Sequence, residues 1–236
     1  GYVLFPQITD ILLDPRALYP LLKQDLGGHI AFMHIRDGYD IYREYMKAHQ
    51  QRTHGMALFD DKRSEARRDM HDDWLVMAYD DDGTAIGCML YKMESYKGRM
   101  QVEQFYYDNS QGRYLLLSWF ARHIDQVKRV DMFAHGMERP ATWYPDLNVT
   151  PKYEDWLTPM GRVLDVSLLN EIDINQGAFT AAIVDEQFPW NNGTFRFECR
   201  DGKLHVEPTN AAADCTLTIQ ALSALVYGTL PVEDFT

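Results

Sequence analysis

The chain has 236 residues, of which 46% are hydrophobic, so it can hold one large or two small folded domains, and intrinsic disorder is excluded. Its formal net charge of −12 at pH 7 argues against nucleic acid as a partner, because phosphates are bound through clusters of Lys and Arg. The acidic field is compatible with two roles, solubility alone or attraction of a polycationic substrate.

The N-terminal segment is predicted to contain a short strand and a short helix. The strand is Gly1–Phe5, which is either the late strand of a preceding domain or an ordinary N-terminal edge strand. The helix begins at Asp14-Pro15, where Asp is a suitable N-cap and Pro suits the first helical position. Gly27-Gly28 is expected to end this helix.

A strand, a long helix and a polar helix are predicted next. Residues 29–35 alternate enough for a strand, a helix begins near Asp37, and residues 60–73 are polar and densely charged, as in an exposed helix. The long helix carries aromatic and apolar side chains at helical spacing: Tyr39, Tyr42, Tyr45 and Met46. These aromatics, like those of residues 91–107, either pack in a core or line a ligand groove, and their periodicity favours the core.

The middle of the chain shows the order hairpin, strand, helix, strand. The four predicted strands are residues 74–79, 85–93, 100–107 and 130–134. The hairpin turn is Asp80–Gly83, whose Asp-Gly step suits positive φ. The helix is expected over residues 111–126, with Ser110 as its N-cap.

The C-terminal part follows a connector, residues 140–159, which four prolines divide into short turns. A strand over 160–166 leads to a short helix capped by Ser167. Strands are then predicted at 178–184, at 194–200, beyond the turn Asp201-Gly202, and at 213–219, and a helix over 221–226 comes last.

The segment Phe188-Pro189-Trp190-Asn191-Asn192-Gly193 joins two of these strands and leads to the family resemblance. The order of elements around it resembles the sterol-carrier-type (SCP2-like) domain that ends Eis-like (enhanced intracellular survival) proteins of the GNAT acetyltransferase superfamily. The order over residues 74–134 resembles the GNAT core. The resemblance implies an α+β chain with residues 1–27 as the tail of a preceding GNAT domain and a linker, 28–158 as a second, degenerate GNAT-like domain, and 159–236 as a truncated SCP2-like domain.

The resemblance also identifies where acetyl-CoA would bind. GNAT enzymes hold its pyrophosphate on backbone N–H groups in a loop with the signature Gln/Arg-x-x-Gly-x-Gly/Ala, because glycine allows close approach and a helix N-terminus favours negative charge. The matching loop here is Asp108–Arg113, which has one glycine and an aspartate that repels phosphate. The string Arg52–Ala57 does match the signature, but it follows a helix, so Gly55 serves either phosphate binding or, more simply, a helix C-cap.

The function implied by the resemblance is transfer of acetyl from acetyl-CoA to an amine substrate, such as an aminoglycoside or a polyamine. The amine would attack the thioester directly while a base removes its proton. This chain is expected to supply the scaffold and part of the substrate pocket of a homo-oligomer, and to be inactive alone. Acetyl-CoA would bind to the parent protein, outside this chain, and no residue is assigned a catalytic role. The alternative is an SCP2-like lipid-binding or oligomerisation module without catalysis.

Two further groups of residues raise alternatives. His71 with Asp69, Asp72 and Asp73 suggests a metal site, but the four lie on different helix faces, which favours ordinary surface charge and no metal. Trp190 either caps the core beside a tight Pro–Gly connection, in which the Asn side chains satisfy turn backbone, or lies near an apolar lipid tunnel.

The first residues are not expected to be a signal peptide, and no apolar run approaches the ~18 residues that a membrane span needs. Cys88, Cys199 and Cys215 are odd in number and widely spaced. They are expected to be buried free thiols of a cytoplasmic protein rather than a disulfide framework or a zinc site.

Overall fold

The computed structural model describes residues 2–4, 9–53, 56–70, 72–134, 138–152 and 160–229. The chain forms two compact units. One comprises residues 8–155 and is called the seven-stranded unit below. The other comprises residues 1–7 and 156–236 and is called the C-terminal unit. This division differs from the expected boundary between residues 27 and 28, because residues 9–23 belong to the sheet and core of the seven-stranded unit.

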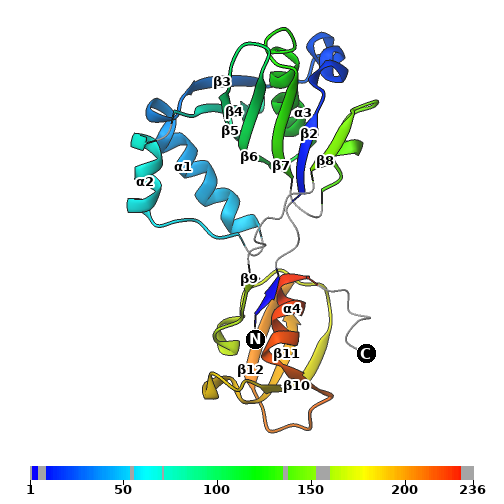
Figure 1. Ribbon diagram of the computed structural model, residues 1–236. Helices are drawn as coiled ribbons and strands as arrows, with labels where there is room; N and C mark the ends of the chain where they lie inside the picture. Colours follow the sequence, from blue (N-terminus) through cyan, green and yellow to red (C-terminus); the bar gives the residue numbers. More distant parts are fainter. Residues whose placement is uncertain are drawn as a thin grey trace. The chain divides into compact units, whose positions relative to one another are not determined.

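The seven-stranded unit is built on one mixed sheet (Figure 1). Its strands are β2 Thr9–Leu13, β3 His29–His34, β4 Trp74–Tyr79, β5 Ala85–Met93, β6 Arg99–Tyr107, β7 Arg129–Ala134 and β8 Val149–Lys152. They lie in the order β3-β4-β5-β6-β7-β2-β8. Neighbours are antiparallel except β6 and β7, which are parallel and pair only from Arg99–Arg129 to Val102–Met132.

Helices cover both faces of this sheet (Figure 1). The helices are the 3-10 helix η1 Pro15–Lys23, α1 Ile35–Arg52, α2 Asp61–Met70, α3 Ser110–Ala121 and the 3-10 turn η2 Pro140–Thr142. One core lies between the sheet and α3 with η1, and the other lies between the sheet and α1. Strands β4 and β5 are buried on both faces, which explains their nearly continuous apolar sequences.

The hairpin, strand, helix and strand predicted over residues 74–134 are confirmed as β4, β5, β6, α3 and β7. The predicted aromatic face of α1 is also confirmed as core, since Tyr39, Tyr42 and Tyr45 are buried. The predicted cap of α3 was wrong by one residue, because the Asn109 side chain accepts the hydrogen bond from the Gly112 N–H. Helix α3 also ends five residues early, at Ala121.

Two strands were not predicted. Strand β2 pairs with both β7 and β8, so its place depends on partners more than a hundred residues away in sequence. Strand β8 lies within the proline-rich connector that was expected to hold only turns. Its Pro151 is tolerated because β8 is an edge strand of the sheet, where a missing N–H need not pair.

The C-terminal unit contains a four-stranded sheet in the order β12-β11-β10-β13 and a two-stranded pair, β1-β9. Its elements are β1 Val3–Leu4, β9 Met160–Gly161, η3 Val166–Leu168, β10 Ala178–Val184, η4 Pro189–Asn191, β11 Gly193–Arg200, β12 Lys203–Pro208, β13 Cys215–Thr218 and α4 Ile219–Tyr227. Strands β10 and β13 are parallel, and the other neighbours are antiparallel. The side chains of Phe195, Phe197 and Ile183 pack with α4 residues in its core.

Most elements of this unit match their predictions, with two differences. Strand β9 has two residues, not seven, and η3 is capped by Asp165, whose side chain accepts from the Ser167 N–H.

The three cysteines of the chain are free, as expected, but only Cys88 is buried, and Cys215 is exposed. Helix α4 ends at Gly228, whose left-handed φ of 62° suits a glycine cap. Among the described residues, every helix is too short or too polar to cross a membrane.

Candidate functional site

The loop between β6 and α3 is the position where a GNAT fold would hold pyrophosphate. In this chain, several polar groups of the loop are already hydrogen-bonded to other protein atoms. The Gly112 N–H donates to Asn109 Oδ1 at 2.9 Å, and the Asp108 N–H donates to the Ile86 carbonyl oxygen at 3.0 Å. Two amides that could face a phosphate therefore already have partners. The helix N-terminus is capped by its own side chain rather than left open for a ligand.

Gly112 is needed for packing. A Cβ atom at this position would lie 2.2 Å from the Ile86 carbonyl oxygen and 2.9 Å from its carbonyl carbon. Helix α3 therefore touches the β5 backbone at its first turn, where no side chain fits. This close approach explains the single glycine of the loop without any ligand.

The Asp108 carboxylate connects the loop to helix α1. Its Oδ1 accepts from His49 Nδ1 at 2.9 Å and from the Tyr45 hydroxyl at 3.3 Å, and its Oδ2 accepts from Arg52 Nη2 at 2.8 Å. The Asp108 side chain is only 15% exposed. Burial first, and then the negative charge of Asp108, raise the pKa of the Tyr45 hydroxyl, which keeps it protonated as a donor. A phosphate in this loop would meet a fixed negative charge.

The two loop sequences considered for pyrophosphate binding are thus partners of each other. Arg52, the first residue of the matching string, forms an ion pair with Asp108 of the other loop. Helix α1 ends with Thr53 as its C-cap, and the Thr53 N–H donates to the Gln50 carbonyl oxygen. The expected cap, Gly55, and His54 lie outside the described residues.

A second polar cluster lies on the opposite face of β6, among core side chains. The Tyr107 hydroxyl donates to Glu138 Oε1 at 2.5 Å, and Trp143 Nε1 donates to Glu138 Oε2 at 3.0 Å. Burial and the hydrogen bond to Glu138 raise the pKa of Tyr107 to about 12. Both carboxylate oxygens of Glu138 therefore have donors, so this carboxylate is bound in the cluster and is not poised as a free general base.

A cavity of about 430 Å³ lies beside α1, α2 and β6. Tyr42 and Gln104 line it and are joined by a hydrogen bond of 2.9 Å from the tyrosine hydroxyl to Gln104 Oε1. Its other lining residues include Phe59, Arg43 and Arg63, and Arg63 stacks over the Phe59 ring at 4.2 Å. The lining has two arginines and no Asp or Glu among the described residues, and Arg43 is paired with Asp61 at 2.9 Å, so the lining offers no carboxylate to a polycationic amine.

The C-terminal motif forms a buried polar cluster around Asp185. Arg162 Nη2 donates to Asp185 Oδ1 and Oδ2 at 2.6 and 2.7 Å, and each of these side chains is 1% exposed. Asn191 Nδ2 also donates to Asp185, and Asn191 Oδ1 accepts from the Val166 N–H. Asn192 accepts from the Asp185 N–H. The predicted role of the Asn side chains in satisfying turn backbone is confirmed, and the cluster holds the 162–166 segment to the β10–β11 connection.

Trp190 does not cap the core, contrary to the expectation, because 62% of it is exposed. Its ring stacks on Phe188 with a centroid separation of 4.7 Å, and its indole N–H donates to the Leu164 carbonyl oxygen. A cavity of about 690 Å³ adjoins Trp190, and its described lining also includes Asp165, Asn192 and Thr209. This mixed polar lining is unlike an apolar tunnel for an acyl chain.

The suspected metal site is divided among separate ion pairs. Asp69 pairs with Arg68, Asp72 with His34 and Asp73 with Lys92, and His71 lies outside the described residues. No group of three or more metal-ligating side chains occurs in the described parts of the chain. The expectation of ordinary surface charge was wrong for Asp73, which is fully buried where β4 begins.

Comparison with known proteins bears on the fold and not on the geometry of these sites. The sterol carrier protein domain family matches residues 167–235. No curated protein matches the sequence significantly. Solved structures of similar fold include a GCN5-related N-acetyltransferase from Anabaena variabilis, with a TM-score of 0.77, 15% identity, and coverage of 98% of this chain and 60% of that one. The corresponding values are 0.70, 16%, 97% and 57% for a GCN5-related N-acetyltransferase from Kribbella flavida, and 0.64, 15%, 100% and 61% for Eis1 from Mycobacterium abscessus.

The predicted resemblance is confirmed for the fold, which is α+β and combines a GNAT-like unit with a sterol-carrier-type domain. At 15–16% identity the similarity shows the fold alone. The chain spans 57–61% of the length of these three structures.

Proposed function

We propose that this chain is the part of an acetyl-CoA-dependent N-acetyltransferase that does not hold the cofactor. The fold of its relatives supports acetyl transfer to an amine as the reaction of the whole protein. The observation that supports a cofactor site outside this chain is the ion-pair network of Asp108. This network places a buried carboxylate in the loop that would have to hold pyrophosphate.

The residues present do not fit acetyl-CoA at this loop. Its Gly112 N–H is used by Asn109, and its glycine is required by the Ile86 backbone. A phosphate would have to compete with Asp108 for Arg52 and His49, or bind beside the Asp108 carboxylate while these partners stay on it, and neither arrangement favours a second anion. This chain's role in the reaction is therefore structural, and we assign no catalytic step to its residues.

The acceptor proposed for the whole protein is a small amine, such as an aminoglycoside or a polyamine. The chain's net charge of −12 would attract such a cation to its surface. The cavity beside α1 and α2 is not proposed as the amine site, because its described lining has no Asp or Glu. A contribution of this chain to amine binding would come from its net negative charge.

The test is titration of the chain with acetyl-CoA, followed by calorimetry and by amide hydrogen exchange. We expect no protection of the amides of residues 108–113. The Gly112 N–H is already bonded to Asn109, and the negative charge of Asp108 disfavours the pyrophosphate. We also expect no transfer of acetyl to an aminoglycoside above the rate without protein. Saturable binding that protects these amides would contradict the proposal.

The proposal includes a homo-oligomeric whole protein, as the family resemblance implies. Sedimentation velocity of this chain would show whether its two units suffice for self-association. A single monomeric species at all concentrations would place the determinants of assembly outside this chain.

A further inference from the structure

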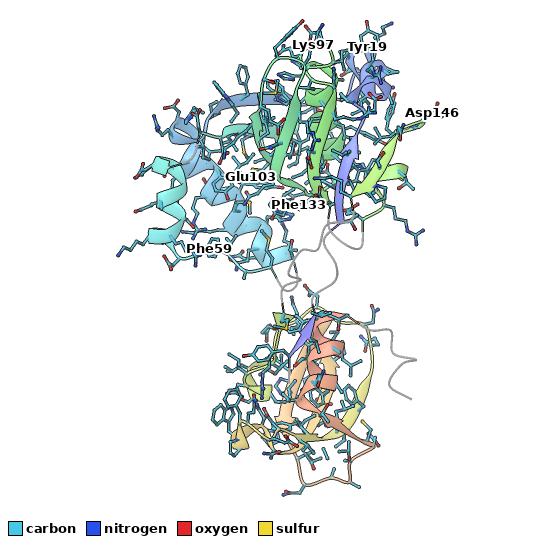
Figure 2. The ribbon with its side chains drawn as sticks, viewed as in Figure 1. Tyr19, Phe59, Lys97, Glu103, Phe133 and Asp146 are labelled. Carbon is cyan, nitrogen blue, oxygen red and sulfur yellow. The ribbon has the colours of Figure 1, made fainter. Side chains whose placement is uncertain are left out.

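A basic cavity lies at the other end of the seven-stranded unit from the loop at residues 107–113. Its volume is about 470 Å³, and four of its lining side chains are basic: Arg16, Lys97, Lys128 and Arg129. They come from η1, from the β5–β6 turn, from the α3–β7 connection and from the first residue of β7, near the point where the parallel strands β6 and β7 begin. Figure 2 shows Lys97 and Tyr19 of η1 at this end, away from Phe133 of β7.

The charge of this cavity is opposite to that of the whole chain. Asp125 is the acidic residue of its described lining. Asp14 is not part of this lining, but it pairs with two of the basic side chains, Arg16 at 2.5 Å and Arg129 at 3.0 Å. Hydrogen bonds from Arg16, opposed by burial, lower the pKa of Asp14 to about 2, so it remains charged. Four positive and two negative charges leave the cavity positive in a chain whose net charge is −12.

The two lysines are the cations available to a ligand. Among the described residues, no carboxylate oxygen lies within 4.0 Å of the Lys97 or the Lys128 ammonium nitrogen. Both side chains are exposed, and Lys97 lies over the Tyr96 ring at 5.4 Å. An anion could therefore bind these ammonium groups without displacing an existing ion pair.

The backbone holds the two lysines in place. The Lys97 N–H donates to the Gln126 carbonyl oxygen at 2.6 Å, and the Lys128 N–H donates to the Gly98 carbonyl oxygen at 3.0 Å. This pair of bonds fastens the β5–β6 turn to the α3–β7 connection. Lys97 has a left-handed φ of 61°, a conformation that strains a residue other than glycine or asparagine. A lysine at a position that suits glycine is consistent with a role for its side chain.

We propose that this cavity binds the phosphate groups of a small di- or triphosphate. The two lysine ammonium groups, beside the guanidinium groups of Arg16 and Arg129 in the same lining, match the charge and the acceptor oxygens of a polyphosphate. The cavity has the size of an ordinary small-molecule site. Ile124 and Val127 provide an apolar wall against which the organic part of a phosphate ester can pack.

The experiment is calorimetric titration with inorganic tripolyphosphate and, separately, with ATP. The variant is Lys97→Gln with Lys128→Gln, and the matched control is Lys62→Gln with Lys203→Gln, which removes the same charge from sites outside the cavity. We expect one-site binding to the wild-type chain, a loss of affinity of about tenfold or more in the variant, and no such loss in the control. Tighter binding of ATP than of tripolyphosphate would identify a nucleotide or a similar ester as the ligand. Equal affinities would identify the free polyphosphate chain.

Two outcomes would overturn this inference. One is no saturable binding of either probe below roughly 10 mM. The other is an equal loss of affinity in the variant and in the control, which would show binding to the general field of the protein. All four substituted lysines lie outside the described cores, so both double variants are expected to unfold at the wild-type temperature.

The cavity and the loop at residues 107–113 can be tested independently. Acetyl-CoA also carries phosphates, so a weak heat of acetyl-CoA binding could come from either place. Binding at the cavity would be lost in the Lys97→Gln, Lys128→Gln variant and would leave the amides of residues 108–113 unprotected. Binding at the loop would survive in that variant. Failure of one proposal therefore leaves the other standing.

Discussion

Asp185→Ala is expected to lower the free energy of unfolding of the C-terminal unit by about 3–5 kcal/mol, because it leaves a buried arginine without its carboxylate. Arg162 donates two hydrogen bonds to Asp185, and both side chains are 1% exposed. The substitution also removes the acceptor for Asn191 Nδ2 and for the Gln187 and Phe188 N–H groups.

Urea unfolding followed by circular dichroism, with hydrogen exchange at β10 and β11, would measure this loss. The matched control is Asp173→Ala, which removes an exposed carboxylate that pairs with Lys203 in the same unit. Exposed pairs of this kind contribute at most about 1 kcal/mol. A second variant, Arg162→Met with Asp185→Leu, should recover part of the loss, because it leaves no buried charge. If Asp185→Ala were no more destabilising than Asp173→Ala, the cluster would not hold the unit together.

The same cluster predicts how the unit responds to acid. Burial alone would raise the pKa of Asp185, but hydrogen bonds from Asn191, from Arg162 and from backbone N–H groups outweigh burial and hold it well below the ordinary value of 3.8. The unfolded chain therefore takes up this proton at a higher pH than the folded one. The stabilisation is complete above pH 3.8 and is lost as the pH falls below it. In Asp185→Asn, this part of the acid sensitivity should disappear from unfolding curves.

The structure also shows why the sequence predicts the turn at residues 188–193 but not the ion pair between Arg162 and Asp185. The proline, the two asparagines and the closing glycine indicate a tight connection, and that prediction depends on local turn chemistry alone. Arg162 lies 23 residues before Asp185, and no spacing rule links them. The exposure of Trp190 could not be predicted either, because an aromatic residue beside a turn can lie on either side of it.

The two unpredicted strands have the same explanation. Strands β4, β5 and β6 are consecutive and joined by short connections, so their apolar runs and the Asp-Gly turn sufficed. Strand β2 is short and lies between β7 and β8, which come much later in the chain. Strand β8 contains a proline that is tolerated only at an edge. Local sequence patterns do not indicate that β2 pairs with β7 and β8, or that β8 lies at the edge of the sheet.

The loop between β6 and α3 shows most clearly which features of a site cannot be predicted from the sequence. The sequence correctly places Asp108 and a single glycine between β6 and α3, and the charge argument against phosphate follows from that alone. It does not reveal that Asp108 binds Arg52, since the two residues lie 56 positions apart. Nor does it reveal that the glycine serves packing, because a glycine required by a neighbouring backbone looks the same in sequence as one required by a ligand.

Gly112→Ala separates these two explanations of the glycine. We expect it to destabilise the seven-stranded unit by about 3 kcal/mol, because its Cβ would lie 2.2 Å from the Ile86 carbonyl oxygen, a backbone atom that cannot turn away. Gly112 is in a helix, where alanine is otherwise favoured by about 1 kcal/mol, so any loss must come from this overlap.

Gly83→Ala is the control for Gly112→Ala, since its Cβ would meet no atom within 4 Å although its φ is 80°. It should cost only roughly 1 kcal/mol, from backbone strain. Chemical unfolding of both variants gives the comparison. A Gly112→Ala chain as stable as the wild type would show that α3 can move away from β5. The glycine would then be free to serve a ligand, and the steric part of the argument against a pyrophosphate site would fail. A large loss of stability would show that the first turn of α3 is closed against β5 whether or not a ligand is present.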